Sequence, residues 1–345
     1  MKNKKILIGM SGGVDSSVAA MLLRDMGCDV TGVTLILTPD GNTKGAEDAK
    51  NVADKLGIKH ITYDMRDIFR EKVIDSFVND YISGVTPNPC ITCNREIKFG
   101  AMLDLAKSLG CEKIATGHYA ETEVKDGRCL LKRTNSLKDQ SYFLSRLTNS
   151  QLACAVFPLN GYEKADTRRI ADDNGLPVAF KKDSQEICFI PDNDYAYFIK
   201  KYKNIVPKEG NFISKSGEIL GKHSGIINYT IGQRKGLGAF GKPMFVTSIN
   251  AEDNTVTIGE NGEQLGNGCI CGDINSLLYD TLPPKFYADV KIRFRAQPAR
   301  ALITVDGDKV SCKFDTPQRS VTPGQTAVFY VGDYVAGSGK IISAF

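Results

Sequence analysis

The sequence lacks a run of 18 apolar residues, so it predicts no membrane-spanning helix and no membrane partner. A secretion signal is missing as well, because the basic start at 1–5 is followed by only five apolar residues before a glycine loop. We therefore expect a cytoplasmic protein. A strong charge imbalance is also absent: the net charge is +4, which allows nucleic-acid binding without requiring it.

Cysteine, by contrast, is plentiful, with ten residues in a chain of 345. In a long chain expected in the cytoplasm, this number indicates thiol chemistry or metal binding more than a disulfide scaffold. Most of these thiols, such as Cys28, Cys111 and Cys154, should be buried small apolar groups. A structural zinc site is disfavoured, because Cys269-Ile270-Cys271 has the wrong spacing for a zinc knuckle and no histidine beside it.

Two familiar nucleotide-binding motifs are absent, since no Gly-Lys-Ser/Thr phosphate loop and no three-glycine dinucleotide fingerprint are present. Instead, Ser11-Gly12-Gly13-Val14-Asp15-Ser16 lies between the apolar run Ile6–Met10 and a helical segment at Ser17–Leu23. A strand, a glycine turn and a helix N-terminus present backbone N–H groups to an anion. The serines add donors, and Asp15 can hold Mg²⁺ on a polyphosphate. The chain is therefore predicted to bind a nucleotide.

Strand and helix patterns alternate over residues 1 to about 120, which predicts a parallel sheet with its ligand at the carboxyl ends of the strands. After about residue 205, glycine becomes frequent and short alternating segments predict two small β units, the last of them a barrel. The predicted fold class is α/β: a parallel-sheet domain over 1–204, a small β domain over 205–268 and a C-terminal β-barrel over 269–345.

A second informative segment is Thr86-Pro87-Asn88-Pro89-Cys90-Ile91-Thr92-Cys93-Asn94. Its prolines stiffen an extended approach, and two thiols follow just before a helix that we expect to start near Glu96. A thiol near a helix N-terminus has a lowered pKa and reacts as a thiolate. A third thiol, Cys188, lies between the polar pair Asp183-Ser184 and the apolar Phe189-Ile190. These flanks predict a mobile polar segment that is pinned by an apolar anchor.

Together these motifs resemble the tRNA-specific 2-thiouridylases, ATP pyrophosphatases that thiolate the wobble uridine of tRNA. The glycine loop resembles their SGGxDS pyrophosphate loop. The resemblance runs through nearly the whole chain, over Gly9–Ser16, Thr86–Asn94, Ile97–Gly100, Ala115–Tyr119, Lys138–Leu144, Asp183–Ile190, Thr230–Gly238 and Val321–Gln325. It implies an ATP pyrophosphatase domain, a central β domain and a tRNA-contacting barrel.

The resemblance also implies residue roles. Cys93 would be the catalytic nucleophile, and Cys188 would carry a persulfide. ATP would be held, with Mg²⁺ on Asp15, by Gly9, Met10, Ser11, Gly12, Gly13, Val14, Asp15, Ser16, Leu35 and Gly117. The target base and the rest of the tRNA would contact Asn88, Pro89, Cys90, His118, Lys138, Asp139, Gln140, Arg293, Phe294 and Gln325.

The expected reaction starts with adenylation of the uracil C2 oxygen, which makes AMP a good leaving group. A persulfide on Cys188, loaded by a sulfur-donor protein, would then deliver sulfur, and Cys93 and Cys188 would end as a disulfide. In a competing hypothesis, Cys90, Cys93 and Cys188 hold a [4Fe–4S] cluster. This hypothesis is favoured because position 90 is Cys in this chain, whereas some members of the family have Asp there. A different ATP-pyrophosphatase ligase and a non-catalytic RNA-binding protein are two further hypotheses.

Overall fold

The structure is a computed structural model that describes residues 1–39, 43–181 and 187–345. Its residues divide into two compact units. The first comprises Met1–Ile74, Cys90–Gln185 and Gly332–Ala336, and the second comprises Asp75–Pro89, Glu186–Val331 and Gly337–Phe345.

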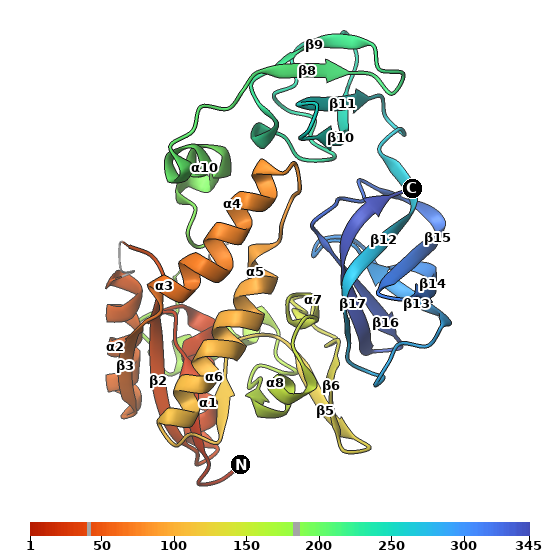
Figure 1. Cartoon of the computed structure of the whole chain (residues 1–345). Helices are drawn as coiled ribbons and strands as arrows, with labels where there is room; N and C mark the ends of the chain where they lie inside the picture. Colours follow the sequence, from red (N-terminus) through yellow and green to blue (C-terminus); the bar gives the residue numbers. More distant parts are fainter. Residues whose placement is uncertain (40–42, 182–186) are drawn as a thin grey trace. The chain divides into compact units, whose positions relative to one another are not determined.

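The first unit contains a parallel five-stranded sheet in the order β3-β2-β1-β4-β7. Figure 1 labels its edge strand β3 and the neighbouring β2. The strands are β1 (Lys5–Gly9), β2 (Asp29–Ile36), β3 (Lys59–Asp64), β4 (Lys113–Ala115) and β7 (Ala155–Val156). From β1 the chain steps outward to β2 and β3, and then returns to form β4 on the opposite side of β1. This reversal creates a topological switch point at β1 and β4, where open α/β sheets bind ligands.

Apolar residues cover both faces of this sheet. Ile6 and Ile8 of β1 pack in a buried cluster with residues of the helices that follow β1 and β2. Gly9, on the opposite face, lies against Met102.

The helices and 3₁₀ or π segments (η) of this unit are α1 (Val14–Asp25), α2 (Thr43–Leu56), α3 (Arg66–Phe69), η1 (Arg70–Ile74), α5 (Pro89–Thr92), η2 (Cys93–Ala101), α6 (Met102–Ser108), α7 (Ser141–Leu144), α8 (Asn149–Cys154) and α9 (Lys164–Asp173).

One helix begins earlier than the sequence predicts. We expected a helix to start near Glu96, but helical structure begins at Pro89 with α5 and continues through the π-helical η2 into α6. Proline is favourable at the first helical position, because its missing N–H would have no intrahelical acceptor there. Cys90 therefore lies in the first turn and Cys93 in the next turn, so the influence of the helix N-terminus is weaker at Cys93 than expected.

A hairpin joins the sheet to the next helices. Strands β5 (Glu121–Lys125) and β6 (Arg128–Lys132) pair in antiparallel fashion around Asp126 and Gly127, which both have positive φ. That backbone conformation is typical of a tight type I′ turn.

The second unit contains two β structures as well as α4 (Asp75–Ile82), the 3₁₀ turns η3 (Pro191–Asn193) and η4 (Ile226–Asn228), and α10 (Tyr195–Lys203). A four-stranded sheet has the order β10-β11-β8-β9. Its strands are β8 (Gly210–Ile213), β9 (Ile219–His223), β10 (Phe245–Asn250) and β11 (Thr255–Gly259). Val246, Val256 and Ile258 form its buried core together with Phe212.

The C-terminal strands follow the order β12-β15-β14-β13-β16-β17, and β12 also pairs with β17. They are β12 (Leu265–Ser276), β13 (Lys285–Lys291), β14 (Ala299–Asp306), β15 (Lys309–Arg319), β16 (Thr326–Val331) and β17 (Tyr334–Ala344). This last pairing closes a six-stranded barrel. The predicted fold class, with a parallel-sheet domain, a small β domain and a barrel, is confirmed.

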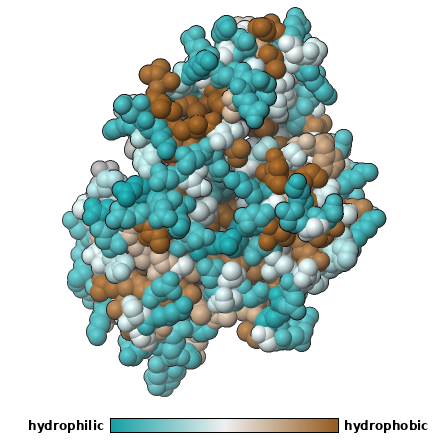
Figure 2. All heavy atoms as spheres, viewed as in Figure 1, coloured by the Kyte–Doolittle hydropathy of each residue, from teal (hydrophilic) through white to brown (hydrophobic). Residues whose placement is uncertain are grey.

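Hydrophilic side chains cover most of the surface seen in Figure 2, and an apolar patch lies in the region of α10. Val206, shortly after α10, is 94% exposed. None of the helices in the described part of the chain combines the length and the apolar character needed to span a bilayer.

Candidate functional site

The glycine loop connects β1 to α1 at the switch point of the sheet. The N–H of Ser11 donates to Ser16 Oγ at 3.2 Å, and Ser16 Oγ donates to the Gly13 carbonyl at 3.1 Å. Gly13 stands at the N-cap of α1 and has no side chain to bind the first N–H groups of the helix. These uncapped N–H groups and the positive end of the helix form an anion-binding position.

Two glycines are required here by contacts with backbone. Gly12 has a φ of +71°, and a Cβ at this position would lie 2.4 Å from the Gly45 carbonyl oxygen. Gly117, in the segment after β4, would place a Cβ only 2.7 Å from the Ser16 amide nitrogen. The segments after β1 and β4 therefore meet at the start of α1, which brings Gly117 and the predicted Gly9–Ser16 loop together.

Asp15 is the centre of a polar cluster that sequence reasoning missed. Lys164 Nζ donates to both carboxylate oxygens of Asp15, at 2.7 and 2.8 Å. The hydroxyl of Tyr119 also donates to Asp15, at 2.7 Å, and bonds with Thr167 at 2.9 Å. Because the Lys164 side chain is only 15% exposed, this ion pair is largely shielded from water. No local sequence signal marks Lys164, which reaches Asp15 only because α9 packs against α1.

A second lysine lies at the same loop. Lys181 Nζ donates to the Gly12 carbonyl at 2.9 Å and to Asp48 Oδ2 at 2.6 Å. Two ammonium groups, on Lys164 and Lys181, thus adjoin the helix N-terminus. This concentration of positive charge and N–H donors is suited to a polyphosphate.

The remaining predicted nucleotide contacts lie at the same carboxyl edge of the sheet. Met10 is buried, and its N–H donates to the Val33 carbonyl at 2.8 Å. Its carbonyl accepts from Thr34 Oγ1 at 2.7 Å. Leu35, the next residue of β2, is partly buried beside this contact. These bonds hold the edge of the sheet on which the glycine loop begins.

The two thiols of the proline-rich segment differ in exposure. Cys90 is exposed, whereas Cys93 is 8% exposed. Next to Cys93, Asn94 donates through Nδ2 to the Phe143 carbonyl at 3.1 Å. Its Oδ1 is buried and has no hydrogen-bond partner within the described residues. A buried acceptor without a partner costs about 1–3 kcal/mol, so this oxygen is available to a donor that enters beside Cys93.

Cys188 is exposed and lies two residues after the undescribed segment 182–186. Its neighbour Phe189 is buried, with its ring 5.4 Å from those of both Phe77 and Phe198. The predicted apolar anchor beside Cys188 is therefore present. The polar pair Asp183-Ser184, which we expected to be mobile, lies outside the described residues.

His118 has a position that favours a structural role over the predicted tRNA contact. It is 9% exposed, and its Nδ1 bonds with Thr116 Oγ1 at 2.8 Å. The aromatic rings of Phe99 and Phe157 lie beside it. Burial holds the pKa of His118 well below the usual value, so the imidazole is neutral. A neutral, enclosed ring offers little to a phosphate backbone.

Among the predicted tRNA contacts at 138–140, only Lys138 is exposed. Asp139 accepts from the Thr134 N–H at 3.0 Å and from the Ser141 hydroxyl at 2.7 Å. Gln140 exchanges hydrogen bonds with the backbone of Tyr119, through its side-chain oxygen and its own N–H. These two residues shape the loop that presents Lys138.

In the second unit, two predicted tRNA contacts, both partly exposed, hydrogen-bond to groups of the protein itself. Arg293 donates to the Ser320 carbonyl and, at 2.6 Å, to Thr322 Oγ1. Gln325 Nε2 donates to the carbonyls of Thr86 and Pro87, at 2.9 and 3.2 Å. Phe294 is partly exposed, and Lys291 lies over its ring at 5.5 Å.

The loop that carries Gln325 holds the proline-rich segment in place. The Thr86 N–H donates to the Pro323 carbonyl at 3.1 Å. A Cβ on Gly324, whose φ is +90°, would lie 2.3 Å from Val85 and 2.8 Å from the Thr86 carbonyl oxygen. Asn88 is partly buried and Pro89 is buried. The barrel therefore fixes the chain that leads into Cys90.

Three family models match consecutive parts of the chain. A tRNA methyl transferase HUP domain matches residues 4–192, a tRNA methyl transferase PRC-barrel domain matches 196–260, and an aminomethyltransferase beta-barrel domain matches 267–341. The tRNA-specific 2-thiouridylase MnmA of Clostridioides difficile is 47% identical, over 98% of this chain and 98% of its own length. The chain belongs to the tRNA-specific 2-thiouridylase family.

Further 2-thiouridylases of this family match to the same extent. The protein of the same name from Clostridium acetobutylicum is 48% identical over 98% of this chain and 99% of its own length. That of Treponema denticola is 47% identical over 98% of both chains. The resemblance inferred from the motifs is thereby confirmed, as is the prediction of an enzyme of this family.

Proposed function

We propose that this chain is an ATP-dependent sulfurtransferase that converts the wobble uridine of tRNA to 2-thiouridine. The observation that carries the nucleotide part is the anion-binding position at the switch point, where the N-terminus of α1, Lys164 and Lys181 converge on one glycine loop. Family membership supports the tRNA and thiolation parts. The division into domains at 1–204, 205–268 and 269–345 stays a prediction.

The glycine loop fits a triphosphate, because Gly13 at the N-cap leaves the first N–H groups of α1 without a side-chain partner. Gly12 and Gly117 allow this loop to pack closely against the Gly45 carbonyl oxygen and the Ser16 amide nitrogen, respectively. Asp15 would hold the Mg²⁺ that accompanies ATP, since its Oδ2 accepts from Lys164 alone within the described residues. Mg²⁺ supplies charge neutralisation on the phosphates. Lys164 and Lys181 would bind the pyrophosphate as it leaves, while the C2 oxygen of uracil gains the adenylyl group.

Sulfur transfer is assigned to the two thiols. The terminal sulfur of a Cys188 persulfide attacks C2, the C–O bond to AMP breaks, and AMP leaves with the bonding electrons. The Cys93 thiolate then attacks Cys188 Sγ, which leaves sulfur on C2 as the thiocarbonyl and forms a Cys93–Cys188 disulfide. In a second route Cys93 attacks the persulfide first and releases hydrosulfide as the nucleophile. Either way, a dithiol reductant reopens the disulfide.

The exposure of each thiol supports this assignment. Cys188 is exposed, as a residue that must accept sulfur from a donor protein requires. Cys93 is enclosed, which excludes water from the thiol–persulfide step. Asn94 Oδ1 supplies an acceptor beside Cys93 for a donor on the target base. Binding of the base in such an enclosed site requires it to be turned out of the anticodon loop.

The test is mass spectrometry of nucleosides from tRNA incubated with the protein, ATP, Mg²⁺ and a persulfide donor. Cys93→Ser and Cys188→Ser should each lower 2-thiouridine formation at least 100-fold. Cys90→Asp should keep substantial activity, because some family members carry Asp there, and Cys154→Ser is the matched control. Labelled sulfur should remain on Cys188 in the Cys93→Ser protein, because its transfer is blocked.

Three outcomes would contradict parts of the proposal. A methylated nucleoside instead of a thiolated one would overturn the reaction class, which the descriptions of two of the matching family models make worth measuring. Release of ADP instead of AMP would remove the adenylation step. Activity that requires iron, with no sulfur trapped on Cys188, would replace the persulfide with a [4Fe–4S] cluster on Cys90, Cys93 and Cys188.

A further inference from the structure

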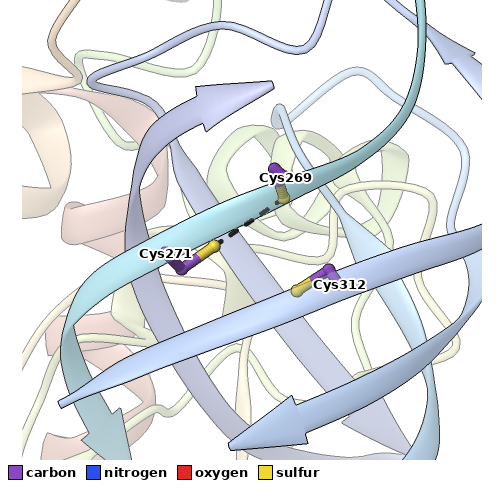
Figure 3. A group of neighbouring side chains, drawn as sticks. All are labelled: Cys269, Cys271 and Cys312. Atoms are coloured by element: carbon purple, nitrogen blue, oxygen red, sulfur yellow. Dashed lines mark hydrogen bonds between the residues drawn. The ribbon is translucent and has the colours of Figure 1, made fainter. Parts of the chain in front are cut away.

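Three cysteines outside the proposed active site come together in the C-terminal barrel. Cys269 and Cys271 are two residues apart on β12, so both side chains lie on the same face of the strand. Cys312 on β15 is the direct cross-strand partner of Cys269. All three residues are 0% exposed. Figure 3 shows the three sulfur atoms directed toward one another from the two neighbouring strands.

The sulfur atoms have the spacing of ligands to a single ion. All three lie within 4.8 Å of one another, and Cys269 Sγ is 3.7 Å from Cys271 Sγ. Three sulfurs arranged trigonally around one ion, at about 2.3 Å each, are about 4 Å apart, so only small side-chain rotations are needed. The sequence spacing of Cys269 and Cys271 alone argues against a metal site, and the pairing with β15 supplies the missing third ligand.

The donor set selects the kind of ion. Thiolate sulfur is a soft ligand that favours Cu(I), Zn²⁺ and iron–sulfur clusters. A structural zinc site needs four ligands, but within the described residues no further Cys, His, Asp or Glu joins this group. A d¹⁰ ion that accepts three sulfur ligands fits the group better, and Cu(I) is the biological ion with that preference.

We propose that the barrel binds one Cu(I) ion through the sulfur atoms of Cys269, Cys271 and Cys312. One proton is released for each thiol that ionises on binding. The proposal concerns a site separate from the proposed thiolation chemistry and does not depend on it.

The barrel also offers a route of entry to this enclosed site. The pairing of β12 with β17 closes the barrel, and its register shifts between Ile270 and Cys271 and again between Gly272 and Asn275. On β17, a Cβ at Gly339 would lie 2.8 Å from the Cys271 Cβ, so this seam is closed by a residue without a side chain. An irregular seam of this kind is where local opening would admit an ion.

The experiment uses the full chain with Cys90, Cys93 and Cys188 replaced by serine, so that these thiols cannot compete. The reduced protein is titrated anaerobically with Cu(I) from its bicinchoninate complex. One equivalent of copper should leave the chelator, raise the thermal midpoint and show three sulfur neighbours in X-ray absorption. Copper that stays on the chelator, or a site with fewer than three sulfur neighbours, would overturn the proposal.

Matched variants locate the ion. Cys312→Ala should weaken Cu(I) binding at least 100-fold, whereas Cys111→Ala, a partly buried thiol of the first unit, should leave it unchanged. If Cys312→Ala does not fold, alkylation of the parent protein provides the same information. Copper should slow alkylation of Cys269, Cys271 and Cys312 during mild heating but not that of Cys111. Equal rates with and without copper, or retention of Zn²⁺ in preference to Cu(I), would contradict the assignment.

Discussion

Residues of the glycine loop form their ion pairs and hydrogen bonds with residues that lie far away in the sequence. Asp15 belongs to a motif that predicts a Mg²⁺ ligand, yet its carboxylate is already paired with Lys164, 149 residues later. A lysine that holds this carboxylate has two uses. We propose that it orients Asp15 before ATP binds, and that it turns to a phosphate when Mg²⁺ takes its place.

The first prediction concerns this lysine. Lys164→Met should lower the rate of AMP and pyrophosphate formation at least 10-fold, because an ammonium group is lost from the phosphate site. It should also destabilise the fold by about 1–3 kcal/mol, since Asp15 is left partly buried without its partner. Lys50→Met is the control, because Lys50 forms an exposed ion pair with Asp54. Equal rates in the two variants would argue against a phosphate role for Lys164.

At the scale of elements, two connections determine the site. The segment after β4 presses against the first turn of α1, and the barrel loop at 320–325 holds the approach to Cys90. Arg293 belongs to this second connection, because its guanidinium binds Ser320 and Thr322. Its substitution would therefore disturb the loop as well as any tRNA contact. An exposed neighbour such as Arg295 is a cleaner probe of RNA binding.

The second prediction tests the contact between β4 and α1. Gly117→Ala should raise the KM for ATP at least 10-fold, because its Cβ would force the Ser16 amide out of position. Overpacking of this kind destabilises a fold by about 1–3 kcal/mol. Gly221→Ala is the matched control, since no atom lies within 4 Å of a Cβ built at that glycine. Unchanged ATP kinetics in Gly117→Ala would show that the loop adapts to the added methyl group.

At the scale of the whole molecule, the three histidines make stability depend on pH. The pKa values of His60, His118 and His223 are all lowered, chiefly because burial disfavours their charged forms. The unfolded chain therefore binds more protons than the folded one below about pH 6.5. By linkage, stability is fully present above that pH and is lost as the pH falls, by up to about 1.4 kcal/mol per pH unit for each histidine.

The third prediction follows from this sign. The thermal midpoint of unfolding should decrease as the pH is lowered from about 7 to about 5.5, a range in which most carboxylates do not yet titrate. His118→Gln, which keeps a group able to bond with Thr116, should make this decline shallower. Scanning calorimetry of both proteins over the pH series measures the difference. A midpoint that stays constant or rises as the pH falls would contradict the burial of neutral histidines.

Local rules were enough to predict a large part of this molecule. Periodicity and glycine stops indicated the alternating strands and helices, and the motif at 11–16 indicated the phosphate loop, because sterics and helix N-terminal chemistry act within a few residues. The sequence also predicted that the proline-rich segment with Cys90 and Cys93 leads into a helix. Its helix begins at Pro89 and not near Glu96, since proline is favoured in a first helical turn.

The meeting of distant side chains, by contrast, depends on the tertiary structure. Nothing near Lys164 or Lys181 in the sequence marks them as partners of the glycine loop. Likewise, the spacing of Cys269 and Cys271 in the sequence does not indicate that Cys312 joins them. Strand pairing places Cys312 opposite Cys269. Ion pairs and thiol clusters of this kind depend on how helices and strands pack, and packing is a property of the whole chain that no local pattern encodes.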